Sequence, residues 1–498
     1  MNEKKLFAPI AIMVGATLLG CTDRPTAPVV ALHRENIAAA VTSDAPSAQI
    51  VRYLAASRGI VALPATPKVR TPLVLLGQSL AFDKILSGNR DISCMTCHLP
   101  AFATGDGRSL SIGQGGTGLG PPRRHPQDAF IPRNAPPLFN LAAMKHLFWD
   151  GRVEVDGSGQ VHTPAGSQVT PAMARVFEFG AASALAMFPV TNRAEMRGGS
   201  GNELAEIPDD DLTGIWSGIM RRLGAIPEYR AMFEAAYPGT KFDNMTFAHA
   251  SNAIGAFIVA KFSFADSPWD RFLAGDDKAL TTRQLEGAQT FLTLKCSICH
   301  NGATFSDEQF HNVAVPQIGP GQGNGESLRD DFGRMNVTHN SEDRYRFRTT
   351  PLRNVELTGP YGHDGAITSL RDFIEHYSES DLKLFAYDDG QLEPGLRGSV
   401  LLNASAILAQ RDTLLAGVVL TPDLIDKLMD YMNALTDNAS RNLSRVVPHR
   451  VPSGITIDRP IANSFREAIV FQECYSPARH RSANNADRCP PESASYQR

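Results

Sequence analysis

Apolar residues recur at the spacing of an α-helix in several segments of this 498-residue chain, and few runs alternate with the two-residue period of a strand. The helical pattern covers residues 50–54, 212–223, 247–262 and 424–435. Thr421 and Pro422 place a capping side chain and a preset first turn ahead of the last segment. Long stretches rich in Gly, Pro and Asn separate the segments. The pattern therefore predicts a mainly α-helical fold with long loops and few strands.

Two more predicted helices each lead into a short motif with two cysteines. The positions that mark them are Leu76, Leu80 and Phe82 in the first helix, and Thr281 and Gln284, a capping box, in the second. Residues 77–80 and 287–290 hold comparable places before the two motifs, which indicates a diverged duplication of one module. Because the chain is longer than one core usually serves, we expect two domains, residues 71–275 and 276–440.

Each motif is Cys-x-x-Cys-His, the pentapeptide through which a c-type haem is attached covalently. The copies are Cys94, Cys97 and His98, and Cys296, Cys299 and His300. Thiols three positions apart reach the vinyl groups on one edge of a porphyrin, and the adjacent imidazole then ligates the iron. A pair of half zinc sites is the alternative, but zinc does not require both copies to end in the same Cys-His pair. We therefore expect two covalently bound haem c groups and redox chemistry.

Residues 1–21 have the composition of a bacterial export signal. Two lysines precede an apolar stretch too short to span a membrane as a mature helix, and the stretch ends in Leu-Leu-Gly-Cys21. This ending resembles the lipobox of bacterial lipoproteins, so Cys21 is expected to become the acylated first residue; an ordinary signal peptide with an incidental cysteine is the alternative. Residues 22–70, rich in Ala, Pro and Ser, suggest a flexible tether. The expected location is the periplasm, with membrane attachment through the lipid alone.

The cysteine count agrees with export. Of the seven cysteines, Cys21 and the four in the motifs are assigned, so Cys474 and Cys489 remain. In an oxidising compartment these two are expected to form a disulfide in the polar C-terminal tail, residues 441–498. The net charge of −4 and the lack of a basic block argue against a nucleic-acid partner.

Several segments, in a shared order, resemble the bacterial di-haem cytochrome c peroxidase and MauG family. They lie between residues 71 and 437 and are LGQSLAFDKILSGNRDISCMTCH, PRNAPPLFN, FWDGR, NRAEM, SPWDRFLAGD, the second haem motif, and FRTTPLRNVELTGPYGHDGAITSLRDFIEHY. In that family peroxide reacts at the N-terminal haem, while the C-terminal haem relays electrons. The resemblance therefore implies that His98 is the proximal ligand of the peroxidatic haem and His300 that of the relay haem.

The residues expected on the opposite face of each haem differ from those of many family members. Where those members have a histidine that blocks the first iron, this chain has Gln114, and glutamine is not a usual haem ligand. The first iron is therefore expected to keep an open sixth site and to bind peroxide without prior reduction, unless His125 on the same loop ligates it.

At the second haem, many members have a methionine ligand fourteen residues after a histidine that corresponds to His363. This chain has Tyr377 there, as the MauG branch does. A phenolate ligand would lower the potential of the second haem and let it share oxidising equivalents. The alternative is a tyrosine packed in the core with another residue as ligand.

The resemblance also implies roles for residues between the haems. Glu195, in NRAEM, matches the glutamate that takes a proton from peroxide and returns it to the leaving oxygen. The alternative is an ordinary loop glutamate that is solvated and inert. Trp149, in FWDGR, matches the tryptophan through which charge hops, a role compatible with a packed core indole. A calcium ion is implied at the Asn134 side chain and at the carbonyl oxygens of Thr358 and Pro360, which are hard donors.

These expectations favour a periplasmic peroxidase that reduces hydrogen peroxide at the N-terminal haem, with electrons relayed through the C-terminal haem from a small cytochrome c or a copper protein. The first alternative is a MauG-like enzyme that oxidises side chains of a protein substrate. The second is a plain di-haem electron carrier, which requires two six-coordinate haems. Family members often dimerise, but the sequence leaves the oligomeric state open between a monomer and a homodimer. No role is assigned to the insertions at residues 118–131 and 153–189.

Overall fold

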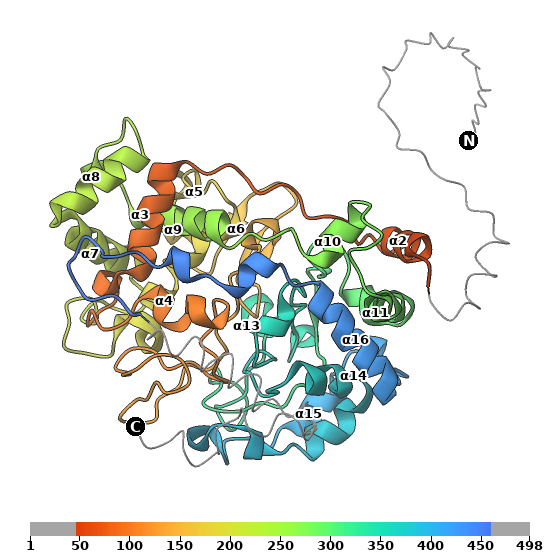
Figure 1. Cartoon of the computed structure of the whole chain (residues 1–498). Helices are drawn as coiled ribbons and strands as arrows, with labels where there is room; N and C mark the ends of the chain where they lie inside the picture. The colour runs from red at the N-terminus through yellow and green to blue at the C-terminus, as the bar shows by residue number, and fades with distance from the viewer. Residues whose placement is uncertain (1–45, 460–498) are drawn as a thin grey trace, which may run out of the picture. The chain divides into compact units, whose positions relative to one another are not determined.

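The structure, a computed structural model, describes residues 46–459 as a mainly helical fold with two small antiparallel sheets and long connecting loops (Figure 1). This agrees with the helical pattern of the sequence and its few strand-like runs. The predicted export signal, the lipidation site Cys21, and Cys474 and Cys489 lie outside the described residues. No helix within residues 46–459 has the length and apolar character needed to cross a membrane.

The helices include several of a single turn. They are α2 (Ala48–Ser57), α3 (Thr71–Phe82), α4 (Cys94–Cys97), α5 (Pro171–Ala174), α6 (Ala181–Ala184), α7 (Leu212–Gly224), α8 (Pro227–Ala236), α9 (Phe247–Lys261), α10 (Pro268–Leu273), α11 (Thr282–Thr293), α12 (Cys296–Cys299), α13 (Met335–Thr338), α14 (Leu370–Phe385), α15 (Ala404–Ala409) and α16 (Pro422–Ala434). The four helices expected from the apolar pattern are present as α2, α7, α9 and α16. The predicted capping box of α11 is confirmed, because Thr281 and Gln284 each accept from the other's backbone N–H group.

Two hydrophobic cores define what we call the N-lobe and the C-lobe. The N-lobe core gathers buried side chains mainly from residues 73–262, and in it α3 packs against α9. Gly77 permits this approach, since a Cβ there would lie 1.8 Å from the carbonyl oxygen of Ala253 and 2.9 Å from Cβ of Phe257. A larger residue at this position would force the two helices apart.

The C-lobe core gathers buried side chains mainly from residues 269–305 and 355–435, and in it α11 packs against α16. Gly287 permits this second approach: a Cβ there would lie 1.9 Å from the carbonyl oxygen of Lys427 and 2.9 Å from Cβ of Tyr431. Both glycines therefore meet a carbonyl group and, four residues further along the partner helix, an aromatic residue.

The two ends of the described chain each pack on the lobe that is distant in sequence. Helix α2 contacts α11 (Figure 1), and its Val51 and Ala55 are fully buried in the C-lobe core. Val446 and Val451 are buried in the N-lobe core. The flexible tether predicted for residues 22–70 therefore does not extend to α2, because the apolar face of that helix is covered by the C-lobe.

Two short sheets connect loops near the lobe boundary. β1 (His146–Leu147), β2 (Val153–Val155) and β3 (Val161–His162) form one antiparallel sheet in that order, and β4 (Phe310–His311) pairs with β5 (Phe347–Arg348) in the other. The first sheet contains the start of the 153–189 insertion. In the second, the backbone N–H of Arg348 also donates to the carbonyl oxygen of Trp149 over 2.9 Å, so this strand supports an N-lobe segment.

A C-lobe segment between α14 and α16 reaches the N-lobe. Leu396 packs with Leu110 in a small third apolar cluster. Glu393 forms an ion pair with the buried guanidinium of Arg108, which also donates to backbone carbonyl groups at the start of the 118–131 insertion. The insertion loop of the N-lobe is therefore fastened to the C-lobe.

Candidate haem-binding active site

Two cavities contain the two Cys-x-x-Cys-His motifs. The N-lobe cavity is lined by the first motif together with Trp149, Arg152 and Glu195. The C-lobe cavity is lined by the second motif together with Trp149 and Tyr377. Each cavity therefore brings predicted haem-attachment residues together with a predicted functional residue that lies far from them in the sequence.

The proximal side is built in the same way in both lobes. The cysteines of each motif occupy one helical turn, α4 or α12, and the histidine follows directly. Nδ1 of His98 lies 2.9 Å from the carbonyl oxygen of Thr104, and Nδ1 of His300 lies 3.0 Å from that of Phe305. Thr104 and Phe305 both have left-handed backbone, with φ of 67° and 59°. A proton on Nδ1 leaves the lone pair on Nε2, which is the atom that a haem iron binds.

The donor groups in both cavities fit a covalently attached haem. All four motif cysteines are free thiols. Burial raises the pKa of Cys94 to about 12 and that of Cys296 to about 11, so these thiols are neutral. Burial also lowers the pKa of His98 and His300, which keeps both imidazoles neutral. Two thiols and a neutral imidazole at the wall of a cavity are the groups that haem c requires.

Glu195 reaches the N-lobe cavity from a π-turn, η7 (Arg193–Arg197). Asn192 caps this turn by accepting from the backbone N–H groups of Ala194 and Glu195. Gly113 packs closely on the turn, since a Cβ there would lie 2.0 Å from the carbonyl oxygen of Ala194. Single π-turns are rare and occur frequently at functional sites.

Glu195 is half-buried, and desolvation raises the pKa of its carboxyl group, while the guanidinium groups of Arg152 and Arg133 act in the opposite direction. Within residues 46–459 no hydrogen-bond donor reaches this carboxyl group. Arg152 lines the same cavity and stacks 3.7 Å above the centre of the Phe148 ring. The cavity that contains His98 therefore also holds the cation of Arg152 and a carboxyl group that is free to exchange protons.

Gln114 and His125 do not line the N-lobe cavity. The Gln114 amide donates to the Asp91 carboxylate over 3.3 Å, and the next backbone N–H donates to the same oxygen over 2.7 Å. Nδ1 of His125 accepts from the backbone N–H groups of Gln127 and Ala129 within its own loop. The Gln114 side chain is therefore turned toward Asp91, which agrees with the expectation that it does not ligate the first iron, and its part in catalysis stays a prediction.

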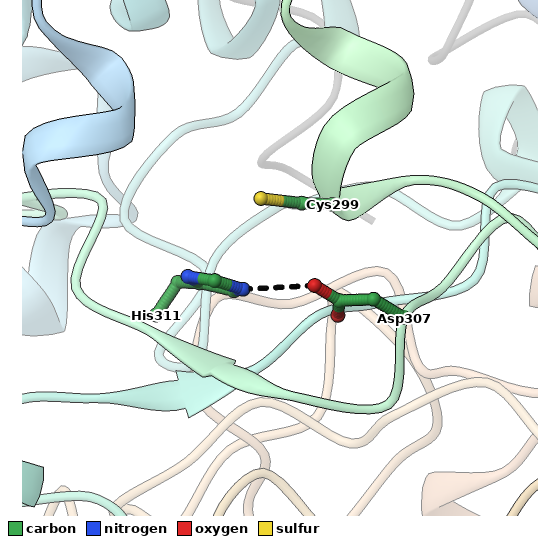
Figure 2. A group of neighbouring side chains, drawn as sticks. All are labelled: Cys299, Asp307 and His311. Atoms are coloured by element: carbon green, nitrogen blue, oxygen red, sulfur yellow. Dashed lines mark hydrogen bonds and ion pairs between the residues drawn. The ribbon is translucent and has the colours of Figure 1, made fainter. Parts of the chain in front are cut away.

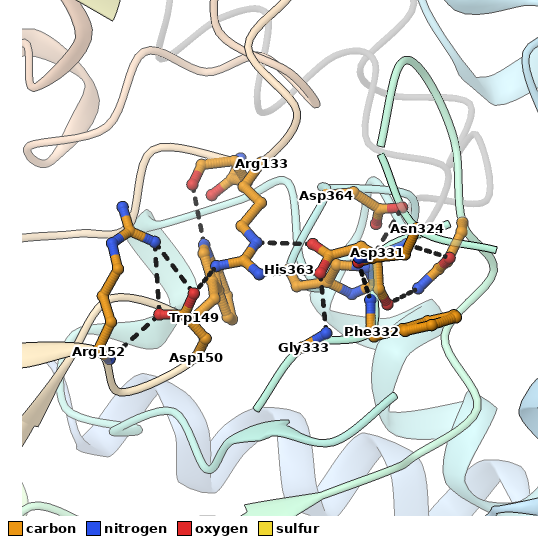
Figure 3. A network of polar contacts seen from close by, with 12 residues as sticks. Arg133, Trp149, Asp150, Arg152, Asn324, Asp331, Phe332, Gly333, His363 and Asp364 are labelled. Atoms are coloured by element: carbon orange, nitrogen blue, oxygen red, sulfur yellow. Dashed lines mark hydrogen bonds and ion pairs between the residues drawn. The ribbon is translucent and has the colours of Figure 1, made fainter. Parts of the chain in front are cut away.

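Trp149 lines both cavities and forms part of the wall between them. Its Nε1 donates to the carbonyl oxygen of Asn134 over 2.9 Å. Beside it, the Arg133 guanidinium bridges the carboxylates of Asp150 and Asp331, each over 2.6 Å (Figure 3). Although burial opposes ionisation of Asp150, the guanidinium groups of Arg133 and its neighbour Arg152 lower the pKa of that carboxyl group to about 2. Buried ion pairs therefore hold the backbone next to the indole.

Tyr377 lies on α14 and lines the C-lobe cavity. Phe373, one turn earlier, contacts it edge to face, with ring centroids 5.5 Å apart. Burial raises the pKa of the Tyr377 phenol, and no hydrogen-bond partner of its hydroxyl group is found among the described side chains and backbone. His363, which lies fourteen positions before Tyr377, stacks on Phe347 with ring centroids 3.7 Å apart. The Tyr377 hydroxyl is therefore free to bind a group in the cavity.

Cys299, Asp307 and His311 form a cluster beside the second motif (Figure 2). The two imidazole nitrogens of His311 lie 3.0 Å from Asp307 and 2.6 Å from Asp412. Burial disfavours the charged ring, but these carboxylates, together with Cys299, raise the His311 pKa to about 11. Cys299 is predicted to attach a haem, and both ring nitrogens of His311 lie against carboxylates, so we interpret the cluster as an ion-paired imidazolium.

The residues predicted to hold calcium, Asn134, Thr358 and Pro360, all line the C-lobe cavity. The Asn134 amide nitrogen donates to the carbonyl oxygens of Arg108 and Ser109, which leaves the amide oxygen for another partner. The three oxygen donors suit a hard cation, although none of them carries charge.

Sequence reasoning missed the four arginines that line these cavities, among them Arg152 and Arg348. Both stand within segments that resemble the family, FWDGR and FRTTPLRNVELTG, so the resemblance was a signal that could have identified them. Nothing in a local pattern distinguishes an arginine that faces a cavity from one that faces water.

The chain is similar to known proteins along most of its length. A family model described as "Di-haem cytochrome c peroxidase" matches residues 71–278. Cytochrome c551 peroxidase of Pseudomonas aeruginosa is 32% identical over 320 residues, which cover 63% of this chain and 74% of that protein. The methylamine utilization protein MauG of Methylorubrum extorquens is 29% identical over 344 residues, which cover 68% of this chain and 78% of that protein.

Two solved structures share the fold. A MauG-like protein associated with microbial copper homeostasis has a TM-score of 0.53 at 24% identity and covers 78% of this chain and 96% of its own. The diheme peroxidase BthA from Burkholderia thailandensis has a TM-score of 0.51 at 20% identity and covers 79% of this chain and 91% of its own. Together with the two haem motifs, the sequence matches show that the chain belongs to the di-haem cytochrome c peroxidase family, so it is an oxidoreductase with two haem groups and with cytochrome c peroxidase or MauG-like activity.

Proposed function

We propose that this protein reduces hydrogen peroxide in the N-lobe cavity. Support comes from Glu195 and Arg152, a proton-exchanging carboxyl group and a cation that line this cavity and not the C-lobe cavity. The haem, when bound, supplies the redox-active iron. Glu195 takes a proton from one peroxide oxygen and delivers it to the leaving oxygen, because a carboxyl group acts as both base and acid. Arg152 stabilises the negative charge that develops on the leaving oxygen.

The observation that carries the proposal is the place of Trp149 in the wall shared by the two cavities. An oxidisable indole between two redox centres replaces one long electron transfer with two shorter ones. Its Nε1–H bond to Asn134 and the ion pairs of Arg133 hold the ring in one orientation. We infer that electrons pass from the C-lobe to the N-lobe through this ring.

The proposed reductant is a small periplasmic cytochrome c or copper protein that binds beside the second motif. Exposed apolar side chains gather in this part of the C-lobe, namely those of Ile298, Leu414 and Val419. Lys295 donates to the carbonyl oxygen of Ala416 over 2.5 Å, which holds the loop against the motif. The periplasmic location and the lipid anchor at Cys21 are part of this proposal and rest on the export signal.

A MauG-like oxidation of a protein substrate is the second candidate, and Tyr377 favours it. Its hydroxyl group faces the C-lobe cavity without a partner among residues 46–459, as expected of a tyrosine that ligates iron. The relative MauG, 29% identical, is named for methylamine utilization. A hard, anionic ligand stabilises oxidised iron, so such a centre suits storage of oxidising equivalents.

We also propose that the two lobes arose by duplication and that calcium binds between them. The matched contacts of Gly77 and Gly287, and of His98 and His300, support the duplication. Asn134 offers its amide oxygen to the cation. Removal of calcium with a chelator should then weaken the reaction with peroxide, and added calcium should restore it.

Electron paramagnetic resonance of the oxidised holoprotein tests the proposed function. One high-spin and one low-spin haem, followed by rapid loss of added peroxide, are expected of the enzyme. Two low-spin haems indifferent to peroxide would instead identify an electron carrier and overturn the proposal. Candidate periplasmic proteins are then compared by the rate at which each re-reduces the peroxide-treated enzyme.

A further inference from the structure

Arg348 is a buried cation at the place where the two cavities meet. It is 7% exposed, and it lines both the N-lobe and the C-lobe cavity. Five other arginines have a similarly small exposed fraction, and each has a carboxylate partner. They are Arg108, Arg133, Arg197, Arg222 and Arg353. Arg123 has three backbone carbonyl groups in place of a carboxylate. Arg348 forms no ion pair with any residue of the range 46–459.

The guanidinium group of Arg348 is also poorly satisfied by hydrogen bonds. Nε donates to the carbonyl oxygen of Phe148 over 3.2 Å, and Nη1 donates to that of Thr349 over 3.3 Å. A guanidinium group has five N–H donors, so these two long bonds leave most of its donors, including both on Nη2, for another acceptor. Burial lowers the Arg348 pKa, and Glu308, the one carboxylate that acts against this shift, lies beyond ion-pair distance.

A buried charge without a partner is costly, which indicates that this site is completed by an anion. The cavities that Arg348 lines hold the haem-attachment motifs, and a haem bound through its vinyl groups carries two carboxylates on its propionate side chains. Arginine binds carboxylates with two parallel hydrogen bonds, for which the free donors of Arg348 suffice.

We propose that Arg348 pairs with a haem propionate where the two cavities meet and thereby sets the potential of that haem. This inference rests on the proposed attachment of haem at both motifs. Arg348 is at the same time a positioning residue for Trp149, because its backbone N–H and its Nε hold the carbonyl oxygens of Trp149 and Phe148. One side chain therefore couples the charge beside a haem to the segment that carries the indole.

The sign of the effect follows from electrostatics. A cation beside the propionate favours the reduced haem, because it offsets negative charge that would otherwise stabilise the oxidised iron. Arg348→Gln should therefore lower the midpoint potential of at least one haem. We expect the equilibrium constant for reduction to fall about tenfold, which for one electron is about 59 mV. The haem with the larger change identifies the cavity in which the pair forms.

The test is a spectroelectrochemical titration of the holoprotein and three variants. Arg348→Lys retains the charge and should keep both potentials close to the wild-type values. Arg222→Gln removes a buried arginine that lines neither cavity and should leave them unchanged. Equal shifts in all three variants, or no shift in Arg348→Gln, would overturn the proposal.

Haem content, measured on each preparation, separates this inference from the proposed function. A wild-type protein that binds two haems but does not reduce peroxide contradicts the proposed function, while its potentials still test Arg348. If Arg348→Gln does not fold, a crystal structure of the haem-loaded wild-type protein decides. A propionate oxygen within roughly 2.7–3.2 Å of an Arg348 nitrogen supports the proposal, and a propionate bound only by other groups refutes it.

Discussion

The N-lobe and C-lobe cavities share a wall and a proximal design, and they differ in the residues opposite the motif. In each lobe a backbone carbonyl group in left-handed conformation holds Nδ1 of the motif histidine. The N-lobe then supplies Glu195 and Arg152, whereas the C-lobe supplies Tyr377. This comparison indicates that the predicted haem attachment depends on one short segment, whereas reactivity depends on the distant side chain that completes each cavity.

Access to the two cavities differs as well. Exposed or partly exposed polar residues, among them His162, Asn336 and His339, line part of the N-lobe cavity. The C-lobe cavity is closed on one side by apolar residues of a loop, among them Leu415 and Val418, and the ion pair of His311 with Asp412 anchors this loop. Under the proposed function, polar lining residues suit entry of peroxide to the N-lobe cavity, and an apolar cover suits a C-lobe centre that relays electrons.

The largest effect on this comparison is expected from Glu195→Gln. The amide cannot accept the peroxide proton, so the rate of the reaction with peroxide should fall by about 10²–10⁴-fold. Stopped-flow mixing with peroxide measures this rate. Glu206→Gln, an exposed glutamate that lines neither cavity, is the matched control. A Glu195→Gln variant as fast as the control would remove the chemical difference between the lobes.

Gly77→Ala and Gly287→Ala test the equivalence of the lobes. In each variant the new methyl group would overlap a carbonyl oxygen of the partner helix, so each should lower the free energy of unfolding by about 1–3 kcal/mol. Gly199→Ala, where no atom lies within 4 Å, should be close to neutral. Chemical denaturation of the holoprotein provides the comparison. Destabilisation by only one of the two interior variants would show that the helix pairs are not equivalent.

Tyr377→Phe should change the C-lobe haem alone. Loss of an anionic ligand destabilises oxidised iron, so the equilibrium constant for reduction of this haem should rise about tenfold or more, with the N-lobe haem unaffected. Tyr361→Phe is the control, because Tyr361 lines the same cavity but donates its hydroxyl group to the carbonyl oxygen of Val355 over 2.9 Å. Identical potentials and spectra in the two variants would exclude Tyr377 as a ligand.

The smallest expected effect is a shift in pH dependence. Burial raises the Glu195 pKa, so the carboxylate needed to accept the peroxide proton forms only above the pH at which an exposed glutamate ionises. The rate should rise with pH through that raised pKa and should lose this limb in Glu195→Gln. The folded state also binds the proton more tightly than the unfolded state, so ionisation of Glu195 lowers stability as pH rises between the two pKa values. An unchanged acid limb in Glu195→Gln would assign it to another group.

The sequence alone determined the features that depend on neighbouring residues. The two haem motifs, the cap at Thr421 and the capping box of α11 involve groups only a few positions apart, so chain geometry within one turn is sufficient. The roles of Glu195, Trp149 and Tyr377 came from resemblance, and the structure brings each to a cavity wall.

Only the tertiary structure decided which side chains face a cavity. Arg348 bonds to Phe148, 200 positions away, and His311 bonds to Asp412, 101 positions away, and no periodicity encodes such pairs. Gln114 shows the same limit, because its position in the sequence suggested a place in the cavity, whereas its amide donates to the Asp91 carboxylate. The physical reason is that side-chain direction depends on how two separately folded cores pack and on where each buried charge finds its partner.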